Sequence, residues 1–272
     1  MDTARETDHM IADAHAHIFP DKIAGKASGA IGEFYEIQMS HVGKIDELLD
    51  SGGAIGVSKY LVCSTATRPD QATAINNFIA ASCAARPGLF YGFGTLHPEQ
   101  EGRERELLRI RSLGLRGIKF HPDFQQFDID DPDMLPCYRL AAELGLPILF
   151  HTGDDRYDHS APSRLANVLE RVPGLTAIAA HLGGYKRWDE ALSALAPGSV
   201  WTDTSSSMSM MPRERALELI EHFGTDRVLF GADFPMWDHT NELQVFLSLG
   251  FDRGTNQRIL HDNFCTLMGI EK

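Results

Sequence analysis

Eight short apolar runs recur along the chain, and each is followed by a segment with the apolar spacing of an amphipathic helix. Strands that alternate with helices in this way pair in parallel and are buried on both faces. The spacing from one run to the next is about 25–30 residues, which is the size of one βα unit. Eight consecutive units predict an α/β fold, a closed (β/α)8 TIM barrel. The predicted strands are residues 10–18, 58–64, 89–96, 115–120, 147–151, 176–181, 200–204 and 227–232.

Many of the predicted helices end at Gly or Pro-Gly, which are helix-stop and turn signals. Residues 19–42 separate the first strand from the first predicted helix, and this Gly- and Ala-rich stretch carries Phe34 and Tyr35. We expect it to be a long insertion that closes over a bound substrate as a lid. An extra helix is expected at the C-terminus, packed against the barrel. The predicted helices are residues 43–50, 70–86, 99–113, 132–144, 162–171, 186–195, 212–223, 242–249 and 256–268.

The length of 272 residues suits one barrel domain, because α/β barrels routinely reach about 250 residues. We expect a single domain over residues 1–272, with its core at about residues 10–269. The chain has 25 Lys and Arg against 38 Asp and Glu, a net charge of −13, and has no basic run. The electrostatic attraction that supplies most non-specific affinity for nucleic acid is therefore missing. We expect no nucleic-acid partner.

The N-terminal residues 1–10 are charged and lack an apolar stretch of signal-peptide length, and no run of 18 apolar residues occurs elsewhere. This pattern predicts a cytoplasmic protein with no membrane partner. The four cysteines are scattered without Cys-x-x-Cys spacing, which argues against disulfides and against a thiolate zinc site.

Four of the twelve histidines stand at the carboxyl ends of predicted strands. His15 and His17 close the first strand, His151 ends the fifth and His181 ends the sixth, while Asp233 follows the eighth. The carboxyl ends of barrel strands meet at one face, where active sites form, so these side chains are expected to converge. Imidazoles and a carboxylate around one point fit zinc or another divalent transition metal with a position left for water.

The order of these motifs resembles a known family. IADAHAHIF, ILFHTGD, IAAHLGG and LFGADFP occur in this order on predicted strands one, five, six and eight, and residues 259–267 (ILHDNFCTL) resemble the usual family ending. The chain is similar to the metal-dependent amidohydrolase superfamily, in particular the amidohydrolase-related branch that includes aminocarboxymuconate-semialdehyde decarboxylase and related aromatic acid decarboxylases. The resemblance extends over residues 11–269.

The resemblance implies a role for individual residues. His15, His17, His151 and Asp233 match the metal ligands of the family. His181 matches the strand-six histidine, which acts on the substrate or the attacking water in mononuclear members and binds a second metal in binuclear ones. Asp233 also shuttles the proton of the nucleophilic water in this family. We therefore expect Asp233 and His181 to be the catalytic groups.

Strand four departs from the binuclear members, which carry a bridging glutamate or a carboxylated lysine there. This chain reads GIKFHPDFQ from residue 117 to 125, with Lys119 and His121 at the same parity. Three interpretations of Lys119 stay open: carboxylation, pairing with a substrate carboxylate, or pairing with Asp123. We expect one bound ion rather than two, and Zn²⁺ as that ion.

Other polar residues are candidates for substrate binding beside Lys119. His121 precedes a proline at a strand end, and Arg156 lies in a polar cluster after strand five, where it could bind an anionic substrate. Such clusters are often only solvated loops. Asp13 shares the parity of His15 and His17 and is expected to support a ligand histidine.

The expected chemistry follows from the metal, which lowers the pKa of a bound water from 15.7 to about 7 and polarises a carbonyl. The main prediction is a hydrolase that cleaves a small-molecule amide, lactone or ester. The alternative is a non-oxidative decarboxylase of an unsaturated or aromatic carboxylic acid. A third interpretation is a barrel that binds metal or ligand without turnover. Exposed helices of such barrels often pair, so a homo-oligomer stays open.

Overall fold

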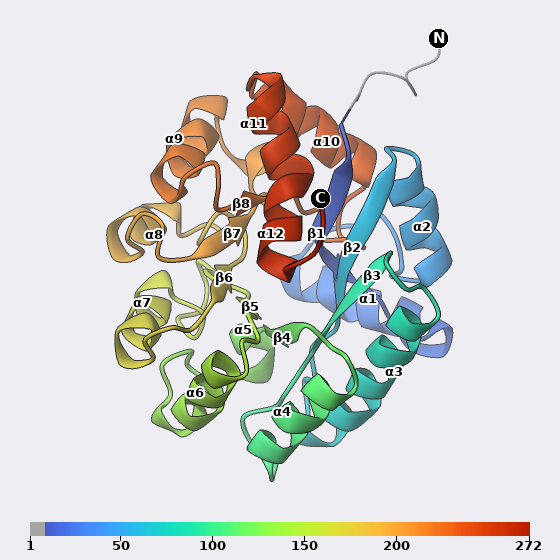
Figure 1. The fold of residues 1–272 in the computed structure, drawn as a ribbon, viewed down its shortest axis with the longest axis vertical. Coiled ribbons are helices and arrows are strands. Elements are labelled where there is room, and N and C mark those ends of the chain that lie inside the picture. The colour runs from blue at the N-terminus through green and yellow to red at the C-terminus, as the bar shows by residue number, and fades with distance from the viewer. Residues whose placement is uncertain (1–8) are drawn as a thin grey trace.

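Eight parallel strands in sequence order form a barrel surrounded by helices in this computed structural model, which describes residues 9–272 (Figure 1). All eight predicted strands are confirmed. Residues 1–8 of the charged N-terminal segment lie outside the described residues. The strands are β1 (Ile11–His17), β2 (Val57–Cys63), β3 (Phe90–Gly94), β4 (Gly117–Phe120), β5 (Ile148–Phe150), β6 (Ala177–Ala179), β7 (Trp201–Asp203) and β8 (Val228–Leu229).

The barrel closes between its first and last strands through backbone hydrogen bonds. The amide of Ala14 donates to the carbonyl of Phe230 at 2.8 Å, and the amide of His17 donates to that of Phe234 at 2.6 Å. The second bond holds the end of β1 against the chain that follows β8. His17 and Asp233, which lie far apart in the sequence, are thereby brought close together at the barrel mouth.

Helices follow the strands and cover the outside of the barrel. Within the described residues, none of them has the length and apolar character needed to cross a membrane. The helices are α1 (Asp21–Tyr35), α2 (Ile45–Gly53), α3 (Ala72–Ala84), α4 (Arg103–Ser112), α5 (Pro122–Gln125), α6 (Leu135–Glu143), α7 (Pro162–Arg171), α8 (Trp188–Ala194), α9 (Arg213–Phe223), α10 (His239–Ser248), α11 (Arg253–Gln257) and α12 (Asn263–Met268).

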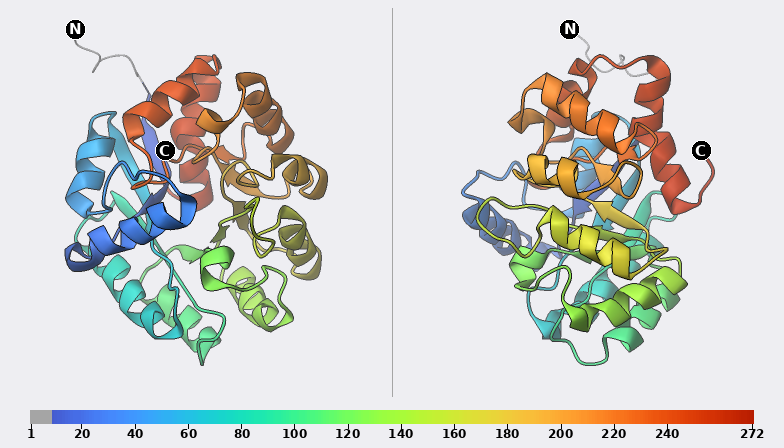
Figure 2. Two further views of the ribbon diagram at one scale, coloured as in Figure 1. Left: turned by 180° about the vertical axis from the view of Figure 1, so that it is seen from behind. Right: turned by 90° about the vertical axis from the view of Figure 1, so that its left-hand side faces the viewer.

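The apolar core has two layers. Small and medium side chains such as Ala12, Leu61 and Leu149 fill the barrel interior, where Phe264 and Met268 of α12 join them. The larger layer lies between the strands and the surrounding helices. The predicted extra C-terminal helix is thus present and closes the end of the barrel opposite α1 (Figures 1 and 2).

Residues 19–42 are mostly helical, and the expectation of an insertion with no helix of its own is wrong. The helix α1 occupies this stretch and lies across the mouth of the barrel (Figure 2, left). Its buried residues Ala24, Ser28 and Gly32 are small and lie four apart, so one narrow face packs against the protein. A Cβ on Gly32 would lie 2.9 Å from the carbonyl oxygen of Ile37, so the chain that follows α1 packs closely against this face of the helix.

An extra residue in β1 breaks the regular alternation of that strand. From Asp13 to Ala16 the chain of β1 advances three residues, while its neighbour β2 advances two, from Tyr60 to Val62. A β-bulge of this kind leaves one residue unpaired and changes which faces the flanking side chains occupy.

The expectation that Asp13 points the same way as His15 and His17 is wrong, because the bulge lies between Asp13 and the histidines. Asp13 lies in the helix layer, where its Oδ2 atom is 3.0 Å from Nε2 of His239, the first residue of α10. We call this group the outer cluster; it consists of Asp13, Ser51, Asp238 and His239.

Candidate active site

Three predicted ligands meet at the carboxyl end of the barrel. Nε2 of His17 lies 3.3 Å from Oδ1 of Asp233, and Nε2 of His15 lies 3.6 Å from the same oxygen. These three side chains each offer one ligand atom within 4.8 Å of the others. Asp233 has a left-handed backbone conformation, with φ of 54°. Such strained positions gather at functional sites because the surrounding structure must hold them.

Asp203, at the end of β7, orients His15 from the other side of its ring. Its Oδ2 lies 3.0 Å from Nδ1 of His15. The carboxylate can only accept, so Nδ1 of His15 carries the proton and Nε2 keeps its lone pair. Asp203 lies at the end of a predicted strand, and no motif in the sequence marks it as part of the site. We call His15, His17, Asp203 and Asp233 the inner cluster.

The imidazoles continue as a row along the cavity wall. Neighbouring ring centres lie 5.1 Å apart from His17 to His15 and from His15 to His181, then 4.8 Å to His151 and 3.9 Å to His121. His181 donates from Nδ1 to the carbonyl oxygen of Ser205 at 3.1 Å, and its Nε2 lies 2.9 Å from Nδ1 of His151. His151, a predicted metal ligand, therefore borders the same cavity beside His181 rather than beside Asp233.

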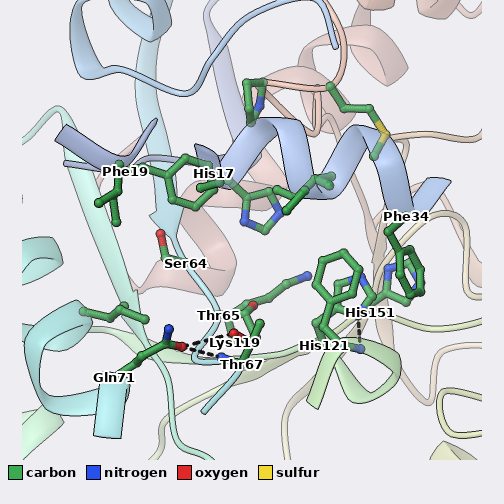
Figure 3. A pocket seen from close by; sticks show the side chains of 18 of the residues that line it. His17, Phe19, Phe34, Ser64, Thr65, Thr67, Gln71, Lys119, His121 and His151 are labelled. Carbon is green, nitrogen blue, oxygen red and sulfur yellow. Dashed lines mark hydrogen bonds between the residues drawn. The ribbon is translucent and has the colours of Figure 1, made fainter. Parts of the chain in front are cut away.

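Lys119 points into this group from β4 and is fully buried. Its Nζ atom lies 3.1 Å from Nε2 of His15. Figure 3 shows the Lys119 side chain on the same wall of the cavity as His121 and His151. Burial lowers the pKa of Lys119, although Cys63 and Asp233 act in the opposite direction. The interpretation in which Lys119 pairs with Asp123 is wrong, because Asp123 instead accepts a hydrogen bond from Ser160 at 2.5 Å.

The lid helix α1 supplies to the site Tyr35, one of the two aromatic residues of the stretch that was expected to close over the substrate. Oη of Tyr35, its last residue, lies 2.8 Å from Nε2 of His121 and 3.4 Å from Nε2 of His151. His121 accepts at Nδ1 from the amide of Phe124, so its Nε2 donates to the tyrosine oxygen. The tyrosine ring thus covers the end of the imidazole row.

Arg156 does not line the cavity. Its Nε and Nη2 atoms donate to the two carboxylate oxygens of Asp154 at 3.0 and 2.8 Å, and Nη1 donates to the carbonyl of Phe34. The guanidinium also lies over the Phe34 ring, 4.6 Å from its centre. The structure therefore places Arg156 behind the end of α1, where it fixes the lid.

The donor groups of the site fit a divalent cation. Burial would raise the pKa of Asp233, but His15, His17 and His181 hold it well below its usual range. Burial and the neighbouring His121, His181 and Lys119 lower the pKa of His151 well below its usual range. An ionised carboxylate and a neutral imidazole are the protonation states that bind metals.

The charge of His17 also fits a cation at this point. Burial lowers the pKa of His17, but Cys63 and Asp233 outweigh it and raise the pKa to about 9. A cation at this point would replace the proton that His17 attracts. Asp123 lies on the wall of the same cavity, and burial raises its pKa to about 6. Within the described residues its Oδ1 is buried without a hydrogen-bond partner, as suits a protonated acid.

A cavity of about 830 Å³ opens from these groups. Its inner end is polar and carries the histidines, Lys119 and Asp233, while α1 and α3 form much of the remaining wall. Binding pockets for small molecules usually measure about 300–1,000 Å³ and combine apolar walls with a few polar groups. The arrangement is that of a small-molecule pocket whose polar end carries side chains that could hold a cation.

Residues 12–263 match the model of a family described as amidohydrolase. The chain belongs to the amidohydrolase family. Enzymes of this superfamily depend on divalent metals, which agrees with the candidate ligands on the barrel mouth. The superfamily and the (β/α)8 barrel predicted from the sequence are both confirmed.

This amidohydrolase is similar to a decarboxylase of known sequence. It is 26% identical over 249 residues to the 2-amino-3-carboxymuconate-6-semialdehyde decarboxylase of Dictyostelium discoideum, and the match covers 74% of this chain and 67% of the relative.

Two solved structures share the fold of this amidohydrolase. The 5-carboxyvanillate decarboxylase of Sphingomonas paucimobilis has a TM-score of 0.75 and 14% identity, with 97% of this chain and 100% of that chain covered. A dihydroxybenzoic acid decarboxylase of Polaromonas, with bound manganese and the inhibitor 2-nitroresorcinol, has a TM-score of 0.72 and 15% identity, with coverage of 96% and 97%. At such identities the likeness concerns the fold alone.

Proposed function

We propose that this amidohydrolase is a metal-dependent, non-oxidative decarboxylase of an aromatic or otherwise unsaturated carboxylic acid. The observation that carries the proposal is the fully buried amine of Lys119, whose Nζ lies 3.1 Å from His15 at the inner end of a largely apolar cavity. A substrate carboxylate would supply the partner that a buried ammonium group requires. The names of the relatives favour this reaction over hydrolysis, the main prediction from the sequence.

The cation would be held by His15, His17 and Asp233, with His151 as the fourth proposed ligand. When bound, it would supply positive charge for the carboxylate and a neighbouring oxygen of the acid. The nitrogen-rich set suits Zn²⁺, and the manganese in a structural neighbour makes Mn²⁺ the other ion to test. We keep one ion rather than two.

The reaction breaks the bond between the carboxylate carbon and the carbon that bears it. The electron pair stays on the second carbon, a proton adds there, and CO₂ leaves. Asp233 is the group placed to carry that proton. It is ionised in the free site, so it first takes a proton, for which a hydroxyl of the substrate is a suitable source, and then passes it to carbon.

The orientation of Asp233 is fixed by its other oxygen. Oγ of Ser206 donates to Oδ2 at 2.6 Å, and Nε1 of Trp237 donates to Oγ of Ser206 at 2.8 Å. Oδ1 is thereby kept toward the cavity. We propose His181 as the second group in contact with the reacting atoms, because it lines the cavity and burial lowers its pKa to about 4, which keeps it neutral.

The remaining residues hold the substrate and exclude water. Lys119 binds the carboxylate, and His121 with Tyr35 forms the adjoining wall. Tyr35 comes from the lid, so closure of α1 over the site removes water from the reacting end. Arg156 was predicted to bind substrate; we propose instead that it acts by holding the end of α1.

The test is CO₂ release from a panel of hydroxylated aromatic and unsaturated acids by protein loaded with Mn²⁺ or Zn²⁺. In D₂O, one deuterium should appear at the carbon that loses the carboxylate. Asp233→Asn should abolish release, while Asp189→Asn, which changes a side chain that is 98% exposed, should have no effect.

Cleavage of an amide, lactone or ester without CO₂ release would favour the hydrolase and contradict the proposal. Tight metal binding with no turnover of either panel would favour the non-catalytic barrel.

A further inference from the structure

The cavity is larger than a single-ring acid requires. Its volume of about 830 Å³ lies near the upper end of the usual range for small-molecule pockets. The histidines, Lys119 and Asp233 lie at its inner end, and the exposed side chains of Lys26, Arg68 and Asp70 also line it. Away from them the walls come from α1 and α3, two helices from separate βα units, which lie near each other at the barrel mouth (Figure 2, left).

The helix α1 turns an apolar face toward this outer half. Five apolar lining residues on this helix are spaced by four, three, one and three positions, which places them on one helical face, while Lys26 and Tyr35 of the same helix also line the cavity. This face is separate from the narrow face that packs against the protein at Ala24, Ser28 and Gly32. Ile23, at its outer end, remains 50% exposed. The residues of this face are Ile23, Ala27, Ala30, Ile31 and Phe34.

The helix α3 presents a matching face. Its residues Ala74, Ile75 and Phe78 line the cavity together with Gln71, which precedes the helix. An adjacent face of α3, with Ala72, Asn76 and Ile79, is buried against the barrel. Ile75 and Phe78 are half-buried and also pack against the apolar core, so the cavity side of the helix is only partly covered by the protein.

We call the part of the cavity between the apolar residues of α1 and α3 the arm. Filling it with water costs free energy, because water there contacts apolar surface. The arm is continuous with the catalytic end, because the same cavity is lined by the histidines and by both helices (Figure 3). An occupant of the arm must therefore be attached to a group that reaches the inner end.

We propose that the substrate is an acid with an extended apolar substituent, an alkyl chain or a second ring, which lies between α1 and α3 against Ile31 and Ile75. This inference rests on the proposed decarboxylation for the position of the carboxylate. The inner end then selects the acid, and the arm selects among acids by the length of their apolar part.

The test is calorimetric binding of 4-alkylbenzoates to the metal-loaded protein. These probes carry the carboxylate and the chain at opposite ends. Each added methylene should tighten binding by about twofold to fourfold, so the pentyl compound should bind on the order of tenfold or more tighter than the methyl compound. The heat-capacity change of binding should become more negative along the series.

A matched pair of variants on α3 locates the effect. Ala74 and Ala81 are both exposed alanines of α3, and only Ala74 lines the cavity. Ala74→Phe should fill part of the arm and bring the affinity of the pentyl probe down to that of the methyl probe, with benzoate binding unchanged. Ala81→Phe should leave the whole series unchanged.

Equal affinity of the methyl and pentyl probes for the unsubstituted protein would overturn the inference, whatever the variants do. Equal effects of Ala74→Phe and Ala81→Phe would overturn it as well. CO₂ release from small acids, with no dependence of binding on chain length, would support the decarboxylase proposal and contradict a role of the arm in substrate selection. Chain-length dependence without CO₂ release from any acid would support the arm and contradict decarboxylation.

Discussion

Two buried clusters of histidine and aspartate lie on either side of β1, and they differ in how their polar atoms are paired. In the outer cluster each ring nitrogen of His239 has its own partner, Asp13 at 3.0 Å and Ser51 at 2.8 Å. In the inner cluster Nε2 of His15 and of His17 both face one oxygen of Asp233, next to a cavity.

The difference shows that residue type and burial do not distinguish a structural polar network from a functional site. The polar side chains of the outer cluster hydrogen-bond to one another, and none of these residues lines the cavity. In the inner cluster, imidazole nitrogens and a carboxylate face the cavity together, where a cation and a substrate can reach them. We expect mutations in the outer cluster to change stability and mutations in the inner cluster to change binding and activity.

The largest effect is expected for Asp233→Asn. Loss of the carboxylate removes a metal ligand and the proton carrier, so kcat/KM should fall by about 10²–10⁴-fold, and the bound metal measured by mass spectrometry should fall well below one ion per chain. A variant that retains its metal and its activity would show that the inner cluster is structural.

Asp13→Ala should have the next largest effect, on stability. Oδ1 of Asp13 accepts the amides of His15 and Ala232, and Oδ2 pairs with His239. Loss of these buried partners should lower the free energy of unfolding by about 2–4 kcal/mol, measured by urea denaturation. Asp13→Asn keeps an acceptor oxygen and should cost less. An unchanged unfolding curve for the alanine variant would contradict the structural role of the outer cluster.

Asp203→Asn should have a smaller effect that is confined to the inner cluster. The asparagine amide is neutral, so the negative charge that faces Nδ1 of His15 is lost. Loss of a residue that orients a metal ligand weakens metal binding by about 10–100-fold. Competition with a chelating dye measures the affinity, and Asp189→Asn is the exposed control. Equal metal affinity of the two variants would argue against Asp203 as the residue that orients His15.

The smallest effect at any one pH step is expected for Glu242, a buried residue of α10 whose pKa depends on Asp233 and Asp13. Burial, followed by the charges of Asp233 and Asp13, raises its pKa from 4.5 to about 8. Its Oε2 atom is buried without a hydrogen-bond partner within the described residues, as suits a protonated acid. Between these two values the folded state binds more protons than the unfolded state, so stability falls as the pH rises.

The slope from this group should reach at most about 1.4 kcal/mol per pH unit. Denaturation of the metal-free protein from pH 5 to pH 8.5 measures it, and Glu242→Gln should flatten the profile in that window. A profile that is identical in the variant would show that Glu242 does not titrate there.

The sequence was sufficient for the strands and for the order of the histidines, because both depend on local patterns. Apolar runs of strand length mark β1 to β8, and active-site residues of a barrel fall directly after them. His15, His17 and Asp233 were found in this way. The position of His151 beside His181 was not predictable, since it depends on the tilt of neighbouring strands.

The helix α1 was missed for a reason of composition. Gly25, Gly29 and Gly32 lower its helix propensity and suggested an irregular segment. The apolar spacing of Ile23 and Ile31, two turns apart, was the signal for a helix. Tertiary contact decides in favour of the helix, because Gly32 packs where a larger residue would clash with Ile37.

The extra residue in β1 has a consequence for protein engineering. The histidines of this strand point into the cavity only because the strand is one residue longer than its neighbour between Asp13 and Ala16, and Asp13 secures the amide of His15 against α10. Grafting two histidines onto a regular strand of another barrel would not reproduce this geometry. The transferable unit is the bulged strand together with the first turn of the helix that anchors it.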